Sequence, residues 1–273
     1  MTEKHNQVRP LFERIVRIGD FDYRLASDDD YLNHIGSDFE PNMCRLFKSL
    51  IEKDFRVFDV GANIGCTSLL FASLAAHVDS FEPSPTTFKM LQRNIQASPH
   101  ANVKLHNHGL GLNNETLTLT FSPSNRSGAF VSDLTQASEG HSIETVEIRK
   151  GDDLFLEVPV DFMKIDVEGY EKNVITGLEG VIKRNRPTVV LELNHWCLNA
   201  FQRVSIPDFF DFLMEIFPII YAVDGERYLD LHDPSHRYHV MYHHIIHFRY
   251  QNLIAAFEPN QVDNFKTRFV RGV

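Results

Sequence analysis

The stretch RVFDVGANIG at residues 56–65 decides the fold, because it joins a short apolar strand to a helix through two glycines. Residues 56–60 are expected to form a buried strand, and the apolar residues from Ile64 to Leu74 recur at helical spacing. Gly61 permits a tight turn, and its missing Cβ lets a ligand approach the backbone. Open α/β sheets bind ligands beyond the carboxyl ends of their strands, so this loop is the first candidate binding site.

Outward from this loop, strand-like apolar runs alternate with helix-period segments from about residue 56 to residue 248. This alternation predicts an α/β fold with a mostly parallel sheet. Residues 108–158 interrupt the rhythm with strictly alternating segments that are typical of half-exposed antiparallel strands, and we interpret them as a small antiparallel insertion. Within the insertion, the polar residues 122–141 are expected to form a loop that covers a bound acceptor.

The same patterns divide the chain into three parts. Residues 1–50 are expected to be a helical extension or lid, residues 51–248 the sheet domain with its insertion, and residues 249–273 a helical tail. The closing strand of the sheet is expected at residues 239–248. Six histidines fall between residues 232 and 247, but transition-metal ligands usually converge from several elements, so we expect no metal site there.

The composition excludes several classes of protein. Hydrophobic residues make up 43% and charged residues 23% of the 273 residues, which excludes a disordered or fibrous protein. No apolar run approaches the roughly 18 residues of a membrane span, and the N-terminal residues predict no secretion signal. The net charge of −10 disfavours nucleic acid as a partner. The three cysteines lie far apart and predict no disulfide framework, which fits a cytoplasmic location.

Glu82 supports the interpretation of the first loop as a binding site. It follows the next strand, at residues 77–81, and lies 21 residues after Gly61, where a carboxylate accepts hydrogen bonds from ribose hydroxyls in dinucleotide sites. The glycine spacing here is G-x-x-x-G, unlike the G-x-G-x-x-G of nicotinamide sites. Asp59 would repel a diphosphate and attract a sulfonium or ammonium group. These residues therefore favour S-adenosyl-methionine over NAD.

Two further strand ends carry residues that suit acid–base chemistry. Asp166 and Glu168 are two residues apart at the end of a strand, so they can point to one side of the sheet. Asp166 is expected to hold the methionine amino group or to act as general base, whereas Glu168 has the alternative of capping the next helix. Glu192 and His195 end the neighbouring strand, and a histidine suits proton abstraction from a hydroxyl.

The successive motifs resemble those of the FkbM family of S-adenosyl-methionine-dependent methyltransferases. The resemblance covers about residues 35–223 and rests on FEP, DVGANIG, FEP, KIDVEGYE and LE, which begin at residues 39, 59, 81, 164 and 191. It implies a class I methyltransferase (Rossmann-like) fold, with a seven-stranded sheet whose last strand is antiparallel. It also implies methyl transfer to an oxygen, commonly on a sugar or a secondary metabolite.

The resemblance also implies a cofactor site for S-adenosyl-methionine, formed by Asp59, Gly61, Asn63, Gly65 and Glu82. We expect Glu40 and Asp166 to contribute to the same site. The expected catalytic residues are Asp166, His195 and Glu192. We expect a small-molecule or carbohydrate acceptor, no nucleic acid partner and no metal, and a homodimer is one option for the assembly. Two alternatives stay open: an NAD(P)-dependent oxidoreductase, and a non-catalytic nucleotide- or metal-binding protein in which Asp166 and Glu168 are structural.

Overall fold

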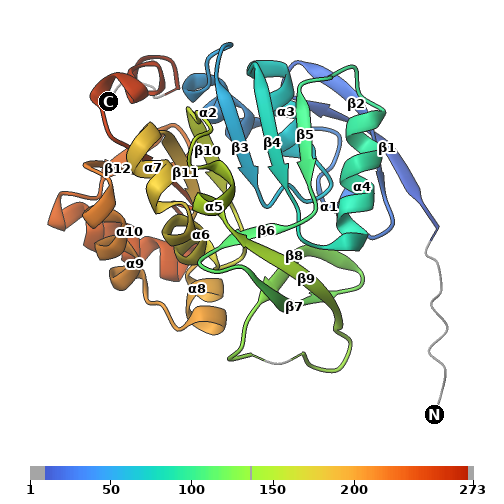
Figure 1. Cartoon of the computed structure of the whole chain (residues 1–273). Helices are drawn as coiled ribbons and strands as arrows, with labels where there is room; N and C mark the ends of the chain where they lie inside the picture. The colour runs from blue at the N-terminus through green and yellow to red at the C-terminus, as the bar shows by residue number, and fades with distance from the viewer. Residues whose placement is uncertain (1–9, 136, 270–273) are drawn as a thin grey trace.

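An eight-stranded sheet forms the middle layer of the protein in the computed structural model, which describes residues 10–135 and 137–269 (Figure 1). In sheet order the strands are β13 (Arg227–Asp230), β12 (Ile219–Asp224), β14 (Asn252–Ala256), β11 (Thr188–Glu192), β10 (Phe162–Ile165), β3 (Arg56–Val60), β4 (His77–Phe81) and β5 (Val103–His106). The five strands from β11 to β5 are parallel, and β14 is antiparallel to both of its neighbours. The predicted α/β class and the antiparallel last strand are confirmed.

The sheet has one strand more than predicted. The extra strand is β13, which pairs antiparallel with β12 at the edge. The predicted position of the last strand is wrong, because residues 239–248 fall largely in the helix α10 (Pro234–His247) and the last strand is β14. A spacing of four residues between histidines fits one face of a helix as well as one face of a strand. Asp233 caps α10 by accepting the N–H of Ser235, and Pro234 occupies its first turn.

Helices cover both faces of the sheet, because alternate residues of each strand point to opposite sides. One hydrophobic cluster lies under α2 (Pro41–Leu50), α3 (Cys66–Leu74) and α4 (Pro85–Gln96). The other lies under α5 (Gly151–Phe155), α6 (Glu171–Gly177), α7 (Glu179–Asn185), α8 (His195–Gln202), α9 (Ile206–Ile216) and α10. In β3, for example, Val57 belongs to the first cluster and Phe58 to the second.

The first described elements are strands, which differs from the helical extension that we predicted for residues 1–50. β1 (Phe12–Ile18) and β2 (Phe21–Ser27) form an antiparallel hairpin, followed by the short helix α1 (Tyr31–His34) and by α2. Val16 and Ile18 are fully buried against the first cluster while their neighbours are exposed, so the alternation of this segment has the period of a strand. The expected helices are therefore present only after residue 30.

The insertion is a separate sheet with the order β6-β9-β7-β8, formed by β6 (Gly109–Gly111), β7 (Glu115–Ser122), β8 (Asn125–Val131) and β9 (Ser142–Lys150). Three of its four strands pair antiparallel, as predicted, and β6 pairs parallel with β9. The loop predicted at residues 122–141 contains β8, so that part of the prediction is wrong. Figure 1 shows the insertion below the carboxyl ends of β3 and β4, where it covers the sheet edge.

The segments after α10 complete the core. β14 lies between β11 and β12, and two short helical segments follow, η1 (Pro259–Val262) and η2 (Phe265–Phe269). Phe265 is fully buried in the cluster under α2. The segment after residue 248, which we expected to be a helical tail, therefore supplies a central strand. Within the described residues, no helix is both long and apolar enough to cross a membrane.

Candidate active site

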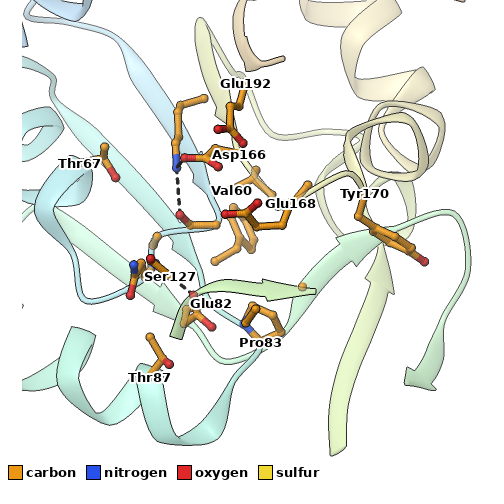
Figure 2. Close-up of a pocket in the computed structure, with 18 of the residues that line it drawn as sticks. Val60, Thr67, Glu82, Pro83, Thr87, Ser127, Asp166, Glu168, Tyr170 and Glu192 are labelled. Carbon is orange, nitrogen blue, oxygen red and sulfur yellow. Dashed lines mark hydrogen bonds and ion pairs between the residues drawn. The ribbon is translucent and has the colours of Figure 1, made fainter. Parts of the chain in front are cut away.

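A cavity of about 260 Å³ opens at the carboxyl ends of β3, β4 and β10 (Figure 2). After β3 the chain continues to β4 and β5 on one side, whereas β10 and β11 extend the sheet on the other. Open α/β sheets bind ligands at such a reversal of strand order. Residues of β8 and the segment around Tyr31 and Glu40 line the rest of the cavity.

The loop after β3 is held between the two neighbouring strands. Gly61 has a φ of +81°, and a Cβ built on it would lie 1.9 Å from the carbonyl oxygen of Asp166. Only glycine fits this position, as the sequence predicted from the turn alone. The amides of Gly61 and Ala62 both donate to the carbonyl oxygen of Phe81, at 3.1 and 3.0 Å. The loop is therefore positioned by backbone contacts before any ligand arrives.

Glu82 lies on the cavity wall beside this loop. Its Oε2 accepts the N–H of Asn63 at 3.0 Å, and its Oε1 accepts the N–H of Ser84 at 2.8 Å. Burial raises the pKa of Glu82 to about 7, although the two backbone N–H groups oppose that shift. A carboxylate has about four acceptor positions, so each oxygen retains one for a ligand hydroxyl.

Asp59 lies behind the loop rather than in the cavity. Its Oδ2 accepts hydrogen bonds from the hydroxyls of Thr67 and Ser68, at 2.8 and 2.6 Å, and its side chain is fully buried. Burial raises the pKa of Asp59, and the ammonium of Lys164, 3.8 Å from Oδ1, partly opposes the shift. These contacts join the start of α3 to β3, so Asp59 supports the loop from below. Gly65, the N-cap of α3, also lies outside the cavity lining.

Lys164 connects the loop to the opposite wall. Its Nζ donates to the carbonyl oxygen of Gly61 at 2.9 Å and lies 3.1 Å from Oδ2 of Asp166. Burial disfavours its charge, but Asp166 and Asp59 outweigh burial and raise the pKa of Lys164. The ammonium therefore fixes the carboxylate of Asp166 and the loop carbonyl in one arrangement.

Three carboxylates meet at the ends of β10 and β11, and we call them the acidic trio: Asp166, Glu168 and Glu192. One oxygen of each lies within 4.8 Å of the other two. Burial, followed by the charge of Asp166, raises the pKa of Glu168 to about 7 and the pKa of Glu192 well above its usual value. In Figure 2 the trio lies on one side of the cavity and Glu82 on another.

His195 is not brought into this cavity. It is the first residue of α8, after the N-cap Asn194, and its ring lies 5.0 Å from that of His244 and 5.4 Å from that of Phe248. Burial lowers the pKa of His195. The neighbouring Trp196 is 59% exposed and contacts the edge of Phe201, so it neither closes the core nor lines the cavity.

The other predicted residues converge. Glu40, Gly61, Asn63, Glu82, Asp166 and Glu192 all line the cavity, although they come from five separate segments. Glu40 and Asn63 have φ values of +33° and +50°, a region that non-glycine residues rarely adopt and that is common at functional sites. Burial, followed by Asp166, raises the pKa of Glu40.

Sequence reasoning missed several lining residues. Lys164 begins the motif KIDVEGYE, but we predicted no role for it. A lysine inside an apolar strand indicates that a counter-charge is buried nearby. Arg126 and Ser127 also line the cavity, but we predicted no binding role for them because we assigned residues 122–141 to a loop. Arg126 is 7% exposed and pairs with Asp28, which no local pattern indicates because the two residues are far apart in the chain.

The family comparison agrees with this geometry: residues 59–228 match the model of the methyltransferase FkbM domain. A protein named methyltransferase 1, from Beauveria bassiana, is 31% identical over 148 residues, which cover 46% of this chain and 59% of the relative. The hexuronic acid methyltransferase AglP of Haloferax volcanii is 31% identical over 147 residues, or 53% of this chain and 58% of the relative. The chain thus matches less than two thirds of the length of these curated relatives.

Among solved structures, the methyltransferase FkbM from Methylobacillus flagellatus is similar over 62% of this chain and 41% of its own, with 16% identity and a TM-score of 0.43.

Proposed function

Because this chain belongs to the FkbM methyltransferase family, we propose that it transfers a methyl group from S-adenosyl-methionine to a hydroxyl of a carbohydrate or another small molecule. The observation that carries the proposal is the pairing of Glu82 with the loop after β3 on one cavity wall. The name of the relative from Haloferax volcanii supports a hexuronic acid as one acceptor to test.

The residues at the ends of β3 and β4 fit the cofactor by their chemistry. Glu82 offers two carboxylate oxygens with free acceptor positions, which suit the two hydroxyls of a ribose. Glu40 and Asp166 make the adjoining wall acidic, which suits the positively charged sulfonium and ammonium groups. When bound, S-adenosyl-methionine supplies an electrophilic methyl group on a positively charged sulfur atom.

We assign the acceptor to the region around Asp166 and Glu192, so that Asp166 lies between the cofactor and the acceptor. Asp166 and Glu192 line the cavity beyond the loop, and a carboxylate there can take the proton of an acceptor hydroxyl, which typically contributes about 10²–10⁴-fold to the rate. Lys164 holds Oδ2 of Asp166 and so orients this carboxylate. We assign the proton to the carboxylates and not to His195, whose ring packs on His244 outside the cavity. Positioning the two reactants can supply a further 7–11 kcal/mol, roughly.

The first experiment measures cofactor binding by calorimetry with S-adenosyl-homocysteine and, separately, NADH. The wild type should bind the first ligand and not the second. Glu82→Ala should weaken binding at least about tenfold, because each lost charge-assisted hydrogen bond contributes about 1.5–3 kcal/mol. The matched control is Glu147→Ala, which removes an exposed carboxylate on β9 outside the cavity lining.

Equal affinity in wild type and Glu82→Ala, with both proteins folded, would exclude this wall as the cofactor site. Binding of NADH instead would favour the oxidoreductase alternative. A labelled-methyl assay over hexuronic acids, neutral sugars and other alcohols then identifies the acceptor class.

A further inference from the structure

We propose that the acidic trio, Asp166, Glu168 and Glu192, binds one hard divalent cation of the Mg²⁺ or Mn²⁺ type. The site lies at the ends of β10 and β11, on the side of the cavity away from Glu82 (Figure 2). Its role in catalysis rests on the proposed function, whereas the binding of the ion rests on these three side chains.

The spacing of the oxygens fits a single ion. One oxygen of each carboxylate lies within 4.8 Å of the other two. Mg²⁺ and Ca²⁺ bind oxygen at about 2.0–2.6 Å, so two ligands on opposite sides of one ion lie about 4–5 Å apart. Carboxylate oxygens suit Mg²⁺, Mn²⁺ or Ca²⁺, whereas zinc and copper sites are commonly built from imidazole or thiolate ligands.

Glu192 points to a ligand independently of this spacing. Its Oε2 is sealed from solvent and accepts no hydrogen bond from any described residue. Leaving a buried acceptor without a partner costs about 1–3 kcal/mol, and more when the group is charged. Figure 2 shows the Glu192 carboxylate directed toward Asp166, so an ion within the trio would occupy the missing position.

The charge balance of this wall also calls for a cation. The ammonium of Lys164 is shared between Asp166, at 3.1 Å, and Asp59, at 3.8 Å. In the described part of the chain, Glu168 and Glu192 have no ion-pair partner, and Glu168 accepts only a thiol from Cys197, at 3.1 Å, and a long contact from Asn194. One divalent ion would compensate the two carboxylates that Lys164 does not reach.

The ion would have space for its waters. A second cavity of about 230 Å³ meets the first at Asp166 and Glu192 and extends to Asn252 on β14. Mg²⁺ usually retains several water ligands, because it loses its hydration shell reluctantly. Asp166 and Glu192 therefore border both cavities, whereas Glu168 lines the first cavity.

If the proposed function is correct, this cation would also determine which acceptors can bind. A bound divalent ion lowers the pKa of an oxygen ligand and orients it, so an acceptor hydroxyl on the ion would lose its proton more readily, to a carboxylate oxygen of Asp166 or Glu192 that does not bind the ion. It would also neutralise a wall that otherwise repels anions, so that an acceptor bearing a carboxylate next to its hydroxyl could enter. We therefore infer a hydroxy acid or a sugar acid as the acceptor class.

Titration of Mn²⁺ into the apo protein, followed by electron paramagnetic resonance, tests the site without any turnover. We compare wild type, Glu168→Gln and Glu192→Gln with the control Glu82→Gln, whose carboxylate lies in the same cavity outside the trio. Wild type and control should bind one Mn²⁺ that Mg²⁺ displaces. The two trio variants should bind it at least about tenfold more weakly, since even a lost supporting contact to a metal ligand costs about 10–100-fold.

Calorimetry with S-adenosyl-homocysteine on the same four proteins separates the two proposals. Glu82→Gln should lose cofactor affinity and keep Mn²⁺, whereas Glu168→Gln should do the opposite. Failure of wild type to bind Mn²⁺, or equal Mn²⁺ affinity in all four proteins, overturns the ion site. Mn²⁺ binding without S-adenosyl-homocysteine binding overturns the proposed function and supports the ion site. Thermal unfolding verifies that each variant is folded. If one of the two trio variants fails to fold, the other is sufficient to test the ion site.

Discussion

At the ends of β3 and β4, the polar groups that face the cavity are held by the backbone, whereas at the ends of β10 and β11 the carboxylates are contacted by other side chains. Both oxygens of Glu82 accept backbone N–H groups, and the loop amides bond to Phe81. In the acidic trio, Glu168 is bonded by a thiol and Oε2 of Glu192 has no partner among the described residues.

This difference separates two ways of preparing a site. The first wall has its final geometry before a ligand arrives, because the chain itself satisfies its polar groups. The second wall places like charges close together in a half-buried position, which destabilises the protein until a cation or a proton compensates them. The following predictions test that contrast, from the largest expected effect to the smallest.

The first prediction concerns the rigidity of the first wall. Gly61→Ala should lower the free energy of unfolding by about 3 kcal/mol, since the new Cβ would meet the Asp166 carbonyl and the positive φ disfavours it. The control is Gly128→Ala on β8, where a Cβ meets nothing within 4 Å, and its effect should stay within about 0.5 kcal/mol. Urea unfolding measures both, and equal stability of the two variants would show that the loop is not held as described.

The second prediction uses pH. The pKa of Glu82 in the free protein is about 7, and only the ionised carboxylate can accept both ribose hydroxyls. Affinity for S-adenosyl-homocysteine should therefore fall by about tenfold as the pH decreases from 8 to 6, because each unit below the pKa removes most of the ionised form. Calorimetry across this range measures the change. A Glu82→Gln variant should bind S-adenosyl-homocysteine weakly at every pH in this range. If its affinity still changes with pH as in the wild type, another group is responsible for the pH dependence.

The smallest effect is expected on the second wall. In buffer without divalent cations at pH 8, Glu192→Gln should raise the free energy of unfolding by about 1 kcal/mol, or the melting temperature by about 2 °C, because it removes a half-buried charge of the same sign as its neighbours. Such a gain is typical of residues kept for function at the expense of stability. A loss of stability on this substitution would mean that the trio is held as well as Glu82 is, and the contrast between the walls would disappear.

Where strands end in glycine or in a carboxylate, the pattern alone indicated residues that line the cavity. Gly61, Glu82 and Asp166 each follow an apolar strand, and the carboxyl ends of parallel strands meet at one edge of a sheet. The errors lie where one pattern fits two structures. The fourfold spacing of the histidines fits both a helix and a strand. The strand β8 is polar because it lines a cavity, and this polar composition led us to predict a loop.

The sequence by itself determined the α/β class, the family and the cavity wall formed by the Gly61 loop and Glu82, because these depend on periodicity and on residues close to one another in the chain. Only the tertiary structure decided which distant side chains share a space. Glu168 reaches the trio through a left-handed backbone, at a φ of +52°, while His195 turns away onto His244 at the start of a helix. The direction of a side chain beyond a strand end depends on such local turns and on the partners packed against it. The spacing of residues in the sequence predicts neither of them.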